Sequence, residues 1–218
     1  MTWVCVLAVI AQVAGPANSG YKTTEGRAQV ASVLTAPGRD ARQKPAELAA
    51  ALGIKPGMTV VDLGTGVGYM LPYLSPLVGN GGIVVAEDIH KDFLDQARAL
   101  VEKDKLANVR FVLGTEQDPN LPARSADLIL VLDAYHHFDY PERMLAKLGA
   151  ALRPGGRLAL VEYYKRRGAM EGDPDRALKH IRLDLDDVVK EVEASGFRLI
   201  SQKEQIPRSQ YVAIFGKK

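Results

Sequence analysis

The chain has 218 residues, and its 28 lysines and arginines nearly balance 26 aspartates and glutamates, which leaves a formal net charge of +2. A hydrophobic fraction of 47% with 25% charged residues is typical of one globular domain, and it excludes disordered, collagen-like and multi-span membrane proteins. The near-balanced charge argues against a dedicated nucleic-acid binder. The single cysteine, Cys5, excludes an intramolecular disulfide framework and any cysteine-rich zinc or iron–sulfur site.

The first twenty residues contain no charged side chain, and twelve of the first fifteen are apolar. Ala17 and Ser19 stand at the −3 and −1 positions that a secretory cleavage site requires. No lysine or arginine supplies the positive start of a signal peptide, and the run is short for a membrane span of about 20 residues. Residues 1–20 are therefore predicted to be a signal peptide or membrane anchor, or else a buried segment that packs against the domain.

From Gly57 onward, short β-branched runs alternate with longer helical patterns, which is typical of βαβ units in a parallel sheet covered on both faces. The predicted strands are residues 59–63, 83–86, 109–113, 127–132 and 157–163, and the predicted helices between them are 69–78, 91–103 and 141–152. Arg153-Pro154-Gly155-Gly156 stops the last of these helices, because proline cannot continue a helix and glycine tolerates a left-handed turn.

The C-terminal part changes its pattern. Asp184 is placed to cap a helix with an apolar face of Val188, Val189 and Val192, and Gly196 is placed to end it. Strands are predicted at residues 197–204 and 210–215, and they should pair as an antiparallel hairpin because no helix separates them. Ahead of the sheet, residues 26–34 and 45–52 predict two short helices that lie over the carboxyl edge of the sheet.

A glycine-rich turn, Gly64-Thr65-Gly66-Val67-Gly68, joins the first strand to the next helix. Glycines at such a junction let the backbone approach a ligand closely, although purely structural turns use the same residues. Asp88 lies 24 residues beyond Gly64, about where an acid hydrogen-bonds a ribose hydroxyl in nucleotide-binding folds. The dinucleotide fingerprint needs a further glycine at position 69, where this chain has Tyr69, so a nicotinamide-dependent dehydrogenase is disfavoured.

The turn resembles motif I of class I S-adenosylmethionine (SAM)-dependent methyltransferases, with Asp62, Gly64, Gly66 and Gly68 in register. Residues 55–58, 86–89, 135–138 and 152–158 match the usual order of that family's other motifs, so the resemblance covers roughly residues 45–200. It implies an α/β fold with a doubly wound, seven-stranded sheet, mostly parallel, whose antiparallel last strand lies beside the fifth. Within the family, the chain is most similar to ubiquinone and menaquinone C-methyltransferases and to arsenite methyltransferases. The lack of cysteines to hold the metalloid excludes arsenite chemistry.

The resemblance implies SAM as the cofactor and assigns its binding residues by position. The glycine loop and Asp62 would hold the methionine end, and Asp88 the ribose hydroxyls, with Glu87 as the competing candidate. Thr115 and Glu116 lie where the family contacts the adenine. The full implied set is Asp62, Gly64, Thr65, Gly66, Gly68, Tyr69, Asp88, Ile89, Thr115, Glu116 and Leu132. Arg39, Asp40 and Gln43 fall in a segment that family members use as a lid over SAM.

Candidate catalytic residues follow the fourth and fifth strands, at the ligand-facing edge of a doubly wound sheet. His136 is the leading general base, because histidine titrates near neutral pH, and its alternative is a packing role. The other catalytic candidates are Asp133, Tyr135 and Glu162, and Glu162 alternatively pairs with an arginine. With only four histidines and no H-x-x-x-H spacing, no metal site is expected.

Three further groups of residues have weaker assignments. Tyr135, Tyr163 and Tyr164 suggest a pocket for an aromatic or amphipathic acceptor, or alternatively a half-buried rim. His180 and Arg182 could reach an anionic group of the substrate. The isolated run at residues 165–167 is a solvated basic turn rather than a nucleic-acid site.

The sequence as a whole predicts a SAM-dependent methyltransferase that acts on a small-molecule acceptor. The alternatives are a nicotinamide-dependent oxidoreductase and a SAM-binding module without turnover. The predicted organisation is an apolar segment at 1–20, a helical lid at 21–54 and the methyltransferase domain at 55–218. Membrane contact is expected only through residues 1–20, and the supply of SAM favours the cytoplasm. Neither the acceptor nor the oligomeric state follows from the sequence.

Overall fold

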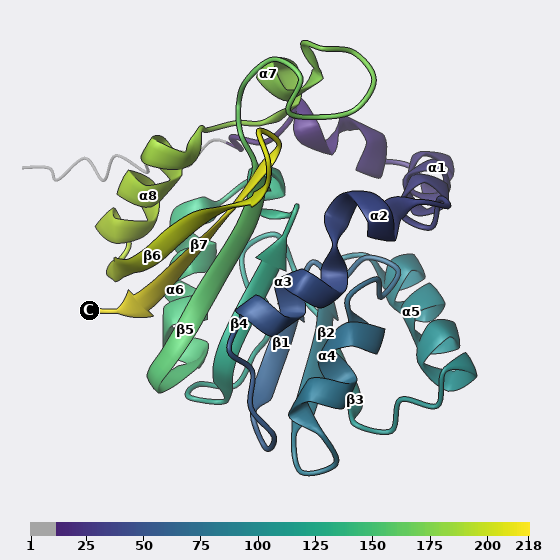
Figure 1. The fold of residues 1–218 in the computed structure, drawn as a ribbon, viewed down its shortest axis with the longest axis vertical. Coiled ribbons are helices and arrows are strands. Elements are labelled where there is room, and N and C mark those ends of the chain that lie inside the picture. Colours follow the sequence, from purple (N-terminus) through teal and green to yellow (C-terminus); the bar gives the residue numbers. More distant parts are fainter. Residues whose placement is uncertain (1–11) are drawn as a thin grey trace, which may run out of the picture.

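The computed structural model describes residues 12–218, which form a sheet with helices on both faces (Figure 1). The strands are β1 (Thr59–Leu63), β2 (Ile83–Asp88), β3 (Val109–Leu113), β4 (Ala126–Leu132), β5 (Leu152–Tyr163), β6 (Phe197–Ile206) and β7 (Gln210–Lys217). They form a seven-stranded sheet with the order β3-β2-β1-β4-β5-β7-β6. The first five strands pair in parallel, and β7 pairs antiparallel with both β5 and β6. The predicted fold, including the antiparallel last strand beside the fifth, is confirmed.

The helices bury two separate apolar layers against the sheet. They are η1 (Ala17–Tyr21), α1 (Thr24–Leu34), α2 (Arg39–Gln43), α3 (Pro45–Ala51), α4 (Leu71–Val78), α5 (Lys91–Lys103), η2 (Tyr135–His137), α6 (Pro141–Ala151), α7 (Arg176–His180) and α8 (Leu185–Ala194). Residues of α3, α4 and α5 pack on one face, and residues of α6 and α8 pack on the other. Strand β4 contributes Leu128 and Leu130 to one layer and Ile129 and Val131 to the other, which explains its unbroken apolar run.

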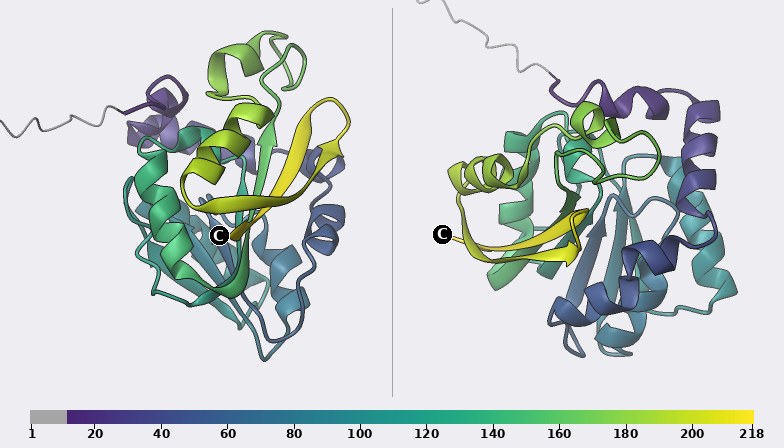
Figure 2. Two further views of the ribbon diagram at one scale, coloured as in Figure 1. Left: turned by 90° about the vertical axis from the view of Figure 1, so that its left-hand side faces the viewer. Right: turned by 45° about the horizontal axis from the view of Figure 1, so that its top comes forward.

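Helix α3 lies elsewhere than the sequence predicts. Leu48, Ala49 and Leu52 are buried against the same face as α4, so α3 is part of the core and does not cover the carboxyl edge of the sheet. The apolar side chains decide this position, because burying them against the sheet removes them from water. Of the predicted lid, η1, α1 and α2 therefore lie nearest to that edge (Figures 1 and 2).

Three element boundaries differ from the predictions in ways that affect the site. Strand β2 continues to Asp88, so Glu87 and Asp88, the two acids expected at its end, are its last paired residues. Helix α4 begins at Leu71, because the turn after β1 extends through Gly68 and Pro72 occupies the first helical turn. Strand β5 begins at Leu152, and the residues between Leu152 and Arg157 bulge out of the register with β4.

The described part of the N-terminal segment packs on the loop after β4. Ala14 and Ala17 are buried, and the Ala14 backbone N–H donates to Asp139 Oδ1 at 3.0 Å. The alternative of a segment packed against the domain agrees with these contacts. The signal-peptide or anchor alternative stays a prediction, since residues 1–11 lie outside the described residues. Within residues 12–218, no helix is both long enough and apolar enough to cross a bilayer.

Candidate active site

A cavity of about 410 Å³ opens at the carboxyl edge of the parallel strands. Its walls come from the ends of β1, β2 and β4, the loop after β3, and the N-terminal segment. Of the residues predicted to bind the cofactor, those in the cavity wall are Asp62, Gly64, Thr65, Gly66, Tyr69, Asp88, Ile89, Thr115, Glu116 and Leu132. The topology brings them together because the carboxyl ends of parallel strands meet at one edge.

All three glycines of the loop have positive φ angles, and the third also has a packing role of its own. Gly64 and Gly66 have φ angles of +69° and +57°, and a Cβ on Gly64 would lie 2.8 Å from that of Ala134. Gly68, unlike the other residues predicted to bind the cofactor, does not line the cavity. A Cβ there would meet Leu71 and Ala97 at 3.0 and 3.1 Å, so this glycine allows α4 and α5 to pack closely.

Two aspartates hold the glycine loop from opposite sides. Asp88 Oδ2 accepts a hydrogen bond from the Gly66 backbone N–H at 2.9 Å, and its Oδ1 accepts one from the His90 N–H at 2.8 Å. The Thr65 hydroxyl donates to Asp62 Oδ2 at 2.6 Å. Burial raises the pKa of each carboxyl, Asp62 and Asp88, to about 6, because removal from water disfavours the charged form.

Glu87 lies beside Asp88 with one oxygen unsatisfied. Its Oε2 accepts a long hydrogen bond of 3.4 Å from the Gly64 N–H, while its buried Oε1 has no partner among the described residues. Burial raises the pKa of Glu87 well above its ordinary value. Both acids line the cavity, so Asp88 as the ribose-binding residue, with Glu87 as its competitor, stays a prediction.

Arg39 brings a positive charge from α2 to the mouth of the cavity. Its guanidinium carbon lies 3.7 Å from the centre of the Tyr69 ring, and its Nη1 donates to the Leu34 carbonyl oxygen at 2.9 Å. Tyr69 therefore supports this arginine at the position where a dinucleotide-binding loop has its last glycine. Both side chains line the cavity.

Asp133 follows β4 directly and faces the same cavity. It has a φ of +52°, and its two carboxylate oxygens accept hydrogen bonds of 2.7 Å from the side-chain amides of Gln43 and Gln210. Burial, reinforced by the nearby Glu162 carboxylate, raises the pKa of Asp133 to about 7. A carboxyl with such a pKa can accept a proton near neutral pH and release it again.

His136 and Glu162 form a buried pair behind Asp133. His136 Nδ1 lies 2.6 Å from Glu162 Oε2, and the two side chains are 4% and 1% exposed. Burial alone would lower the pKa of His136, but the Glu162 carboxylate outweighs it and raises this pKa above its ordinary value. Neither residue lines the cavity, so the structure does not place the predicted general base against a ligand there.

His137, in contrast, reaches the cavity wall. Its Nδ1 lies 2.8 Å from Asn18 Oδ1, and its Nε2 lies 3.4 Å from the Tyr21 hydroxyl. The sequence offers no spacing signal that links Asn18 or Tyr21 to His137, because more than a hundred residues separate them. Tyr21 also stacks on His90 with ring centroids 5.8 Å apart, so η1 closes one side of the cavity.

Comparison with known proteins agrees with this geometry. Residues 61–160 match the family model described as a methyltransferase domain. The chain is 28% identical to a SAM-dependent methyltransferase from Aquifex aeolicus of known structure, with a TM-score of 0.78 over 86% of this chain and 96% of that one. Residues 61–160 are thus similar to a methyltransferase domain, and the chain shares its fold with a SAM-dependent methyltransferase of known structure. The predicted resemblance is confirmed by these matches and by the sheet order.

Two further relatives define how far the likeness extends. The ubiquinone/menaquinone biosynthesis C-methyltransferase UbiE of Teredinibacter turnerae is 31% identical over 119 residues, which are 54% of this chain and 48% of that enzyme. The chain thus matches about half the length of this curated relative. A TehB-like SAM-dependent methyltransferase from Corynebacterium glutamicum is 23% identical, with a TM-score of 0.64 over 89% of this chain and 97% of that one, and shares the fold.

Several residues that the sequence suggests for the acceptor site lie away from the cavity wall. Tyr135 is only 1% exposed and donates its hydroxyl to Glu191 Oε1 at 2.5 Å, so it faces α8 and the core rather than the cavity. Arg182 forms a bidentate pair with Glu191, at 2.9 and 2.5 Å, and is not free to bind an anionic substrate. Tyr163 and Tyr164 lie outside the cavity wall as well.

Proposed function

We propose that the protein is a SAM-dependent methyltransferase that acts on a small-molecule acceptor. The observation that carries this proposal is the cavity at the carboxyl edge of the sheet, where buried carboxylates flank a glycine loop. A cavity of about 410 Å³ is within the range of small-molecule sites. The likeness to the Aquifex aeolicus methyltransferase, which extends over most of both chains, supports the same cofactor here.

The residues that line the cavity can each be matched to one chemical group of SAM. Asp62 would pair with the ammonium group of the methionine, and Arg39 with its carboxylate. Asp88 would accept hydrogen bonds from the ribose hydroxyls, and Thr115 and Glu116 would lie against the adenine. When bound, SAM supplies an electrophilic methyl group on a sulfonium that is already a good leaving group.

Asp133 is the best-placed proton acceptor for the reaction. It lines the cavity, whereas the predicted base His136 lies behind it. Methyl transfer needs the acceptor atom held in line with the methyl group, and some acceptors must also lose a proton. The Gln43 and Gln210 amides fix the Asp133 carboxylate, so its proton-accepting oxygen needs little reorganisation.

Calorimetric titration of the full chain with SAM, S-adenosylhomocysteine and NAD tests the cofactor. We expect micromolar binding of SAM and its product, and an affinity weakened by about 1 to 3 kcal/mol in Asp88→Ala, as for a lost hydrogen bond to a charged group. Asp95→Ala is the matched control, because Asp95 pairs with Lys91 on the exposed side of α5. Binding of NAD without SAM would instead favour the oxidoreductase alternative.

Turnover separates an enzyme from a SAM-binding module. With an acceptor identified by transfer of labelled methyl groups, Asp133→Asn should retain SAM affinity and lower kcat by about 100-fold, as expected for loss of a general base. Unchanged kcat in this variant would remove Asp133 from the mechanism and leave positioning as the main catalytic effect.

A further inference from the structure

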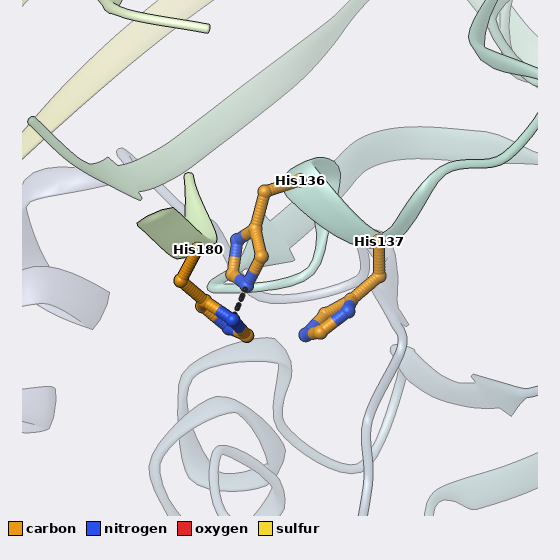
Figure 3. Close-up of side chains that lie close together, drawn as sticks. All are labelled: His136, His137 and His180. Carbon is orange, nitrogen blue, oxygen red and sulfur yellow. Dashed lines mark hydrogen bonds between the residues drawn. The ribbon is translucent and has the colours of Figure 1, made fainter. Parts of the chain in front are cut away.

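Three of the four histidines converge beside the active-site cavity (Figure 3). His136 and His137 come from η2, and His180 ends α7, so residues 44 positions apart in the sequence meet here. One ring nitrogen from each histidine lies within 4.8 Å of the other two, and the Nε2 atoms of His136 and His180 are 3.1 Å apart. His137 lines the cavity, so the cluster borders the proposed active site.

Hydrogen bonds at Nδ1 of two of the rings, His136 and His137, orient their Nε2 atoms toward the other histidines. His136 Nδ1 lies 2.6 Å from the Glu162 carboxylate, and His137 Nδ1 lies 2.8 Å from the Asn18 side-chain oxygen. Because both partners accept hydrogen bonds, each Nδ1 carries the proton and each Nε2 turns a lone pair toward the cluster. In the structure, His137 Nε2 faces the Tyr21 hydroxyl at 3.4 Å and His136 Nε2 faces His180 Nε2 at 3.1 Å, and a bound ion would replace these contacts. A carboxylate or carbonyl oxygen behind the distal nitrogen is the usual environment of a metal-binding histidine.

The charges around the cluster also suit a cation. Glu162 is buried, and its Oε2 lies 2.6 Å from His136 Nδ1. A second carboxylate, Asp133, lies three residues before His136 in the chain and lines the neighbouring cavity. Arg176, on the same helix as His180, is a positive group near the cluster.

We propose that His136, His137 and His180 form a site for a divalent transition-metal ion of the zinc, cobalt or nickel class. Three imidazole nitrogens select such an ion over Mg²⁺ or Ca²⁺, which prefer oxygen ligands. Zinc–nitrogen bonds of about 2.0 to 2.1 Å put the nitrogens of a tetrahedral site about 3.4 Å apart, so the three rings, whose nitrogens lie within 4.8 Å of one another, must draw together around the ion. A water molecule or an oxygen atom of a bound ligand would take the fourth position.

This proposal departs from the sequence-based expectation of no metal, because that expectation considered only spacing along the chain. It does not depend on methyl transfer, since the ion can be measured without SAM. A proton relay from Glu162 through His136 to His180 would use the same hydrogen bonds. The relay requires no ion, so a measurement of metal binding distinguishes a metal site from a proton relay.

The test uses the full, tag-free chain with Cys5→Ser, which removes the only thiol, after treatment with a chelator. Calorimetry with Zn²⁺ should give one ion per chain, and Co²⁺ should produce the visible absorption of a tetrahedral site. His180→Ala should weaken Zn²⁺ binding by more than about 100-fold. Glu162→Gln should weaken it by about 10- to 100-fold, as for other partners behind a metal-binding histidine.

His90→Ala is the matched control, because His90 is the one histidine outside the cluster and should not change the affinity for Zn²⁺. Circular dichroism shows whether each variant is folded, and Zn²⁺ should raise the Tm of the unsubstituted protein but not that of His180→Ala. Absence of stoichiometric binding to the unsubstituted protein at micromolar Zn²⁺ would overturn the proposal. An affinity for Zn²⁺ in His180→Ala and His137→Ala equal to that of the unsubstituted protein would overturn it too.

Discussion

Asp62 carries a cost for the fold that the proposed contact with the cofactor would explain. It is 2% exposed, and burial raises its pKa from 3.8 to about 6. The folded protein therefore holds this proton more tightly than the unfolded chain does. The stabilisation from that proton is complete below about pH 4 and is lost as the pH rises through about 6. At neutral pH the protein keeps a buried negative charge at the end of β1, which is where a cationic ligand group would offset it.

Asp62→Asn should therefore stabilise the protein while weakening cofactor binding. The amide keeps an acceptor for the Thr65 hydroxyl and removes the buried charge. We expect the free energy of unfolding to rise by about 1 to 2 kcal/mol at pH 7.5 and to change little at pH 4.5, where the native carboxyl is protonated. Denaturant unfolding at the two pH values, together with SAM titration, measures both effects. Equal stability changes at both pH values would contradict this electrostatic account.

Tyr135→Phe tests whether Tyr135 is structural. The variant removes a hydroxyl that donates to the Glu191 carboxylate, next to the Arg182–Glu191 pair. A hydrogen bond to a charged group contributes about 1.5 to 3 kcal/mol, so the free energy of unfolding should fall by that amount. The affinity for SAM should not change, because the ring lies outside the cavity. Tyr164→Phe provides a comparison, since Tyr164 is less buried and also lies outside the cavity.

At the scale of elements, local patterns predicted the sheet and the cofactor side of the site. The glycine loop, the β2 acids and the Pro-Gly-Gly stop after α6 are each recognisable within a few residues. Segments that depend on distant contacts were missed. Helix α7 and the 3-10 helix η1 have only five residues each, so neither has a periodic pattern that would reveal it. The convergence of His180 on His136 depends on the long return from β5 to α8.

The position of η1 makes Asn18 a residue of the site. Its amide nitrogen donates to the His137 carbonyl oxygen and to Asp139 Oδ2, both at 3.0 Å, and its Oδ1 accepts from His137. Asn18→Ala leaves these partly buried groups without partners and should cost about 1 to 3 kcal/mol of stability. Ser19→Ala is the matched control, because its exposed hydroxyl donates only to the Pro16 carbonyl oxygen. Thermal unfolding of the two variants should differ clearly, and equal Tm values would show that η1 is not docked in solution.

Across the whole molecule, the two faces of the sheet supply stability and one edge supplies chemistry. Helices α3, α4, α5, α6 and α8 bury apolar side chains, whereas the turns after β1, β2, β3 and β4 carry the polar groups of the cavity. The N-terminal segment and α7 lie at the same end of the molecule (Figure 2). This division concentrates buried carboxylates at one edge, because the helix-covered faces offer them neither hydrogen bonds nor water.

That concentration makes cofactor binding dependent on pH. Asp62 and Asp88 both have pKa values raised to about 6 by burial, so near pH 6 each is about half protonated before SAM binds. Pairing with the ammonium group and the ribose hydroxyls favours the carboxylates, and binding should then release protons. The affinity for SAM should fall by about tenfold at pH 5 relative to pH 7.5 for each carboxyl that must ionise. Calorimetry in buffers of different ionisation enthalpy counts the released protons, and Asp62→Asn should reduce that count. Affinity independent of pH between 5 and 7.5 would mean that neither carboxyl contacts the cofactor in its charged form.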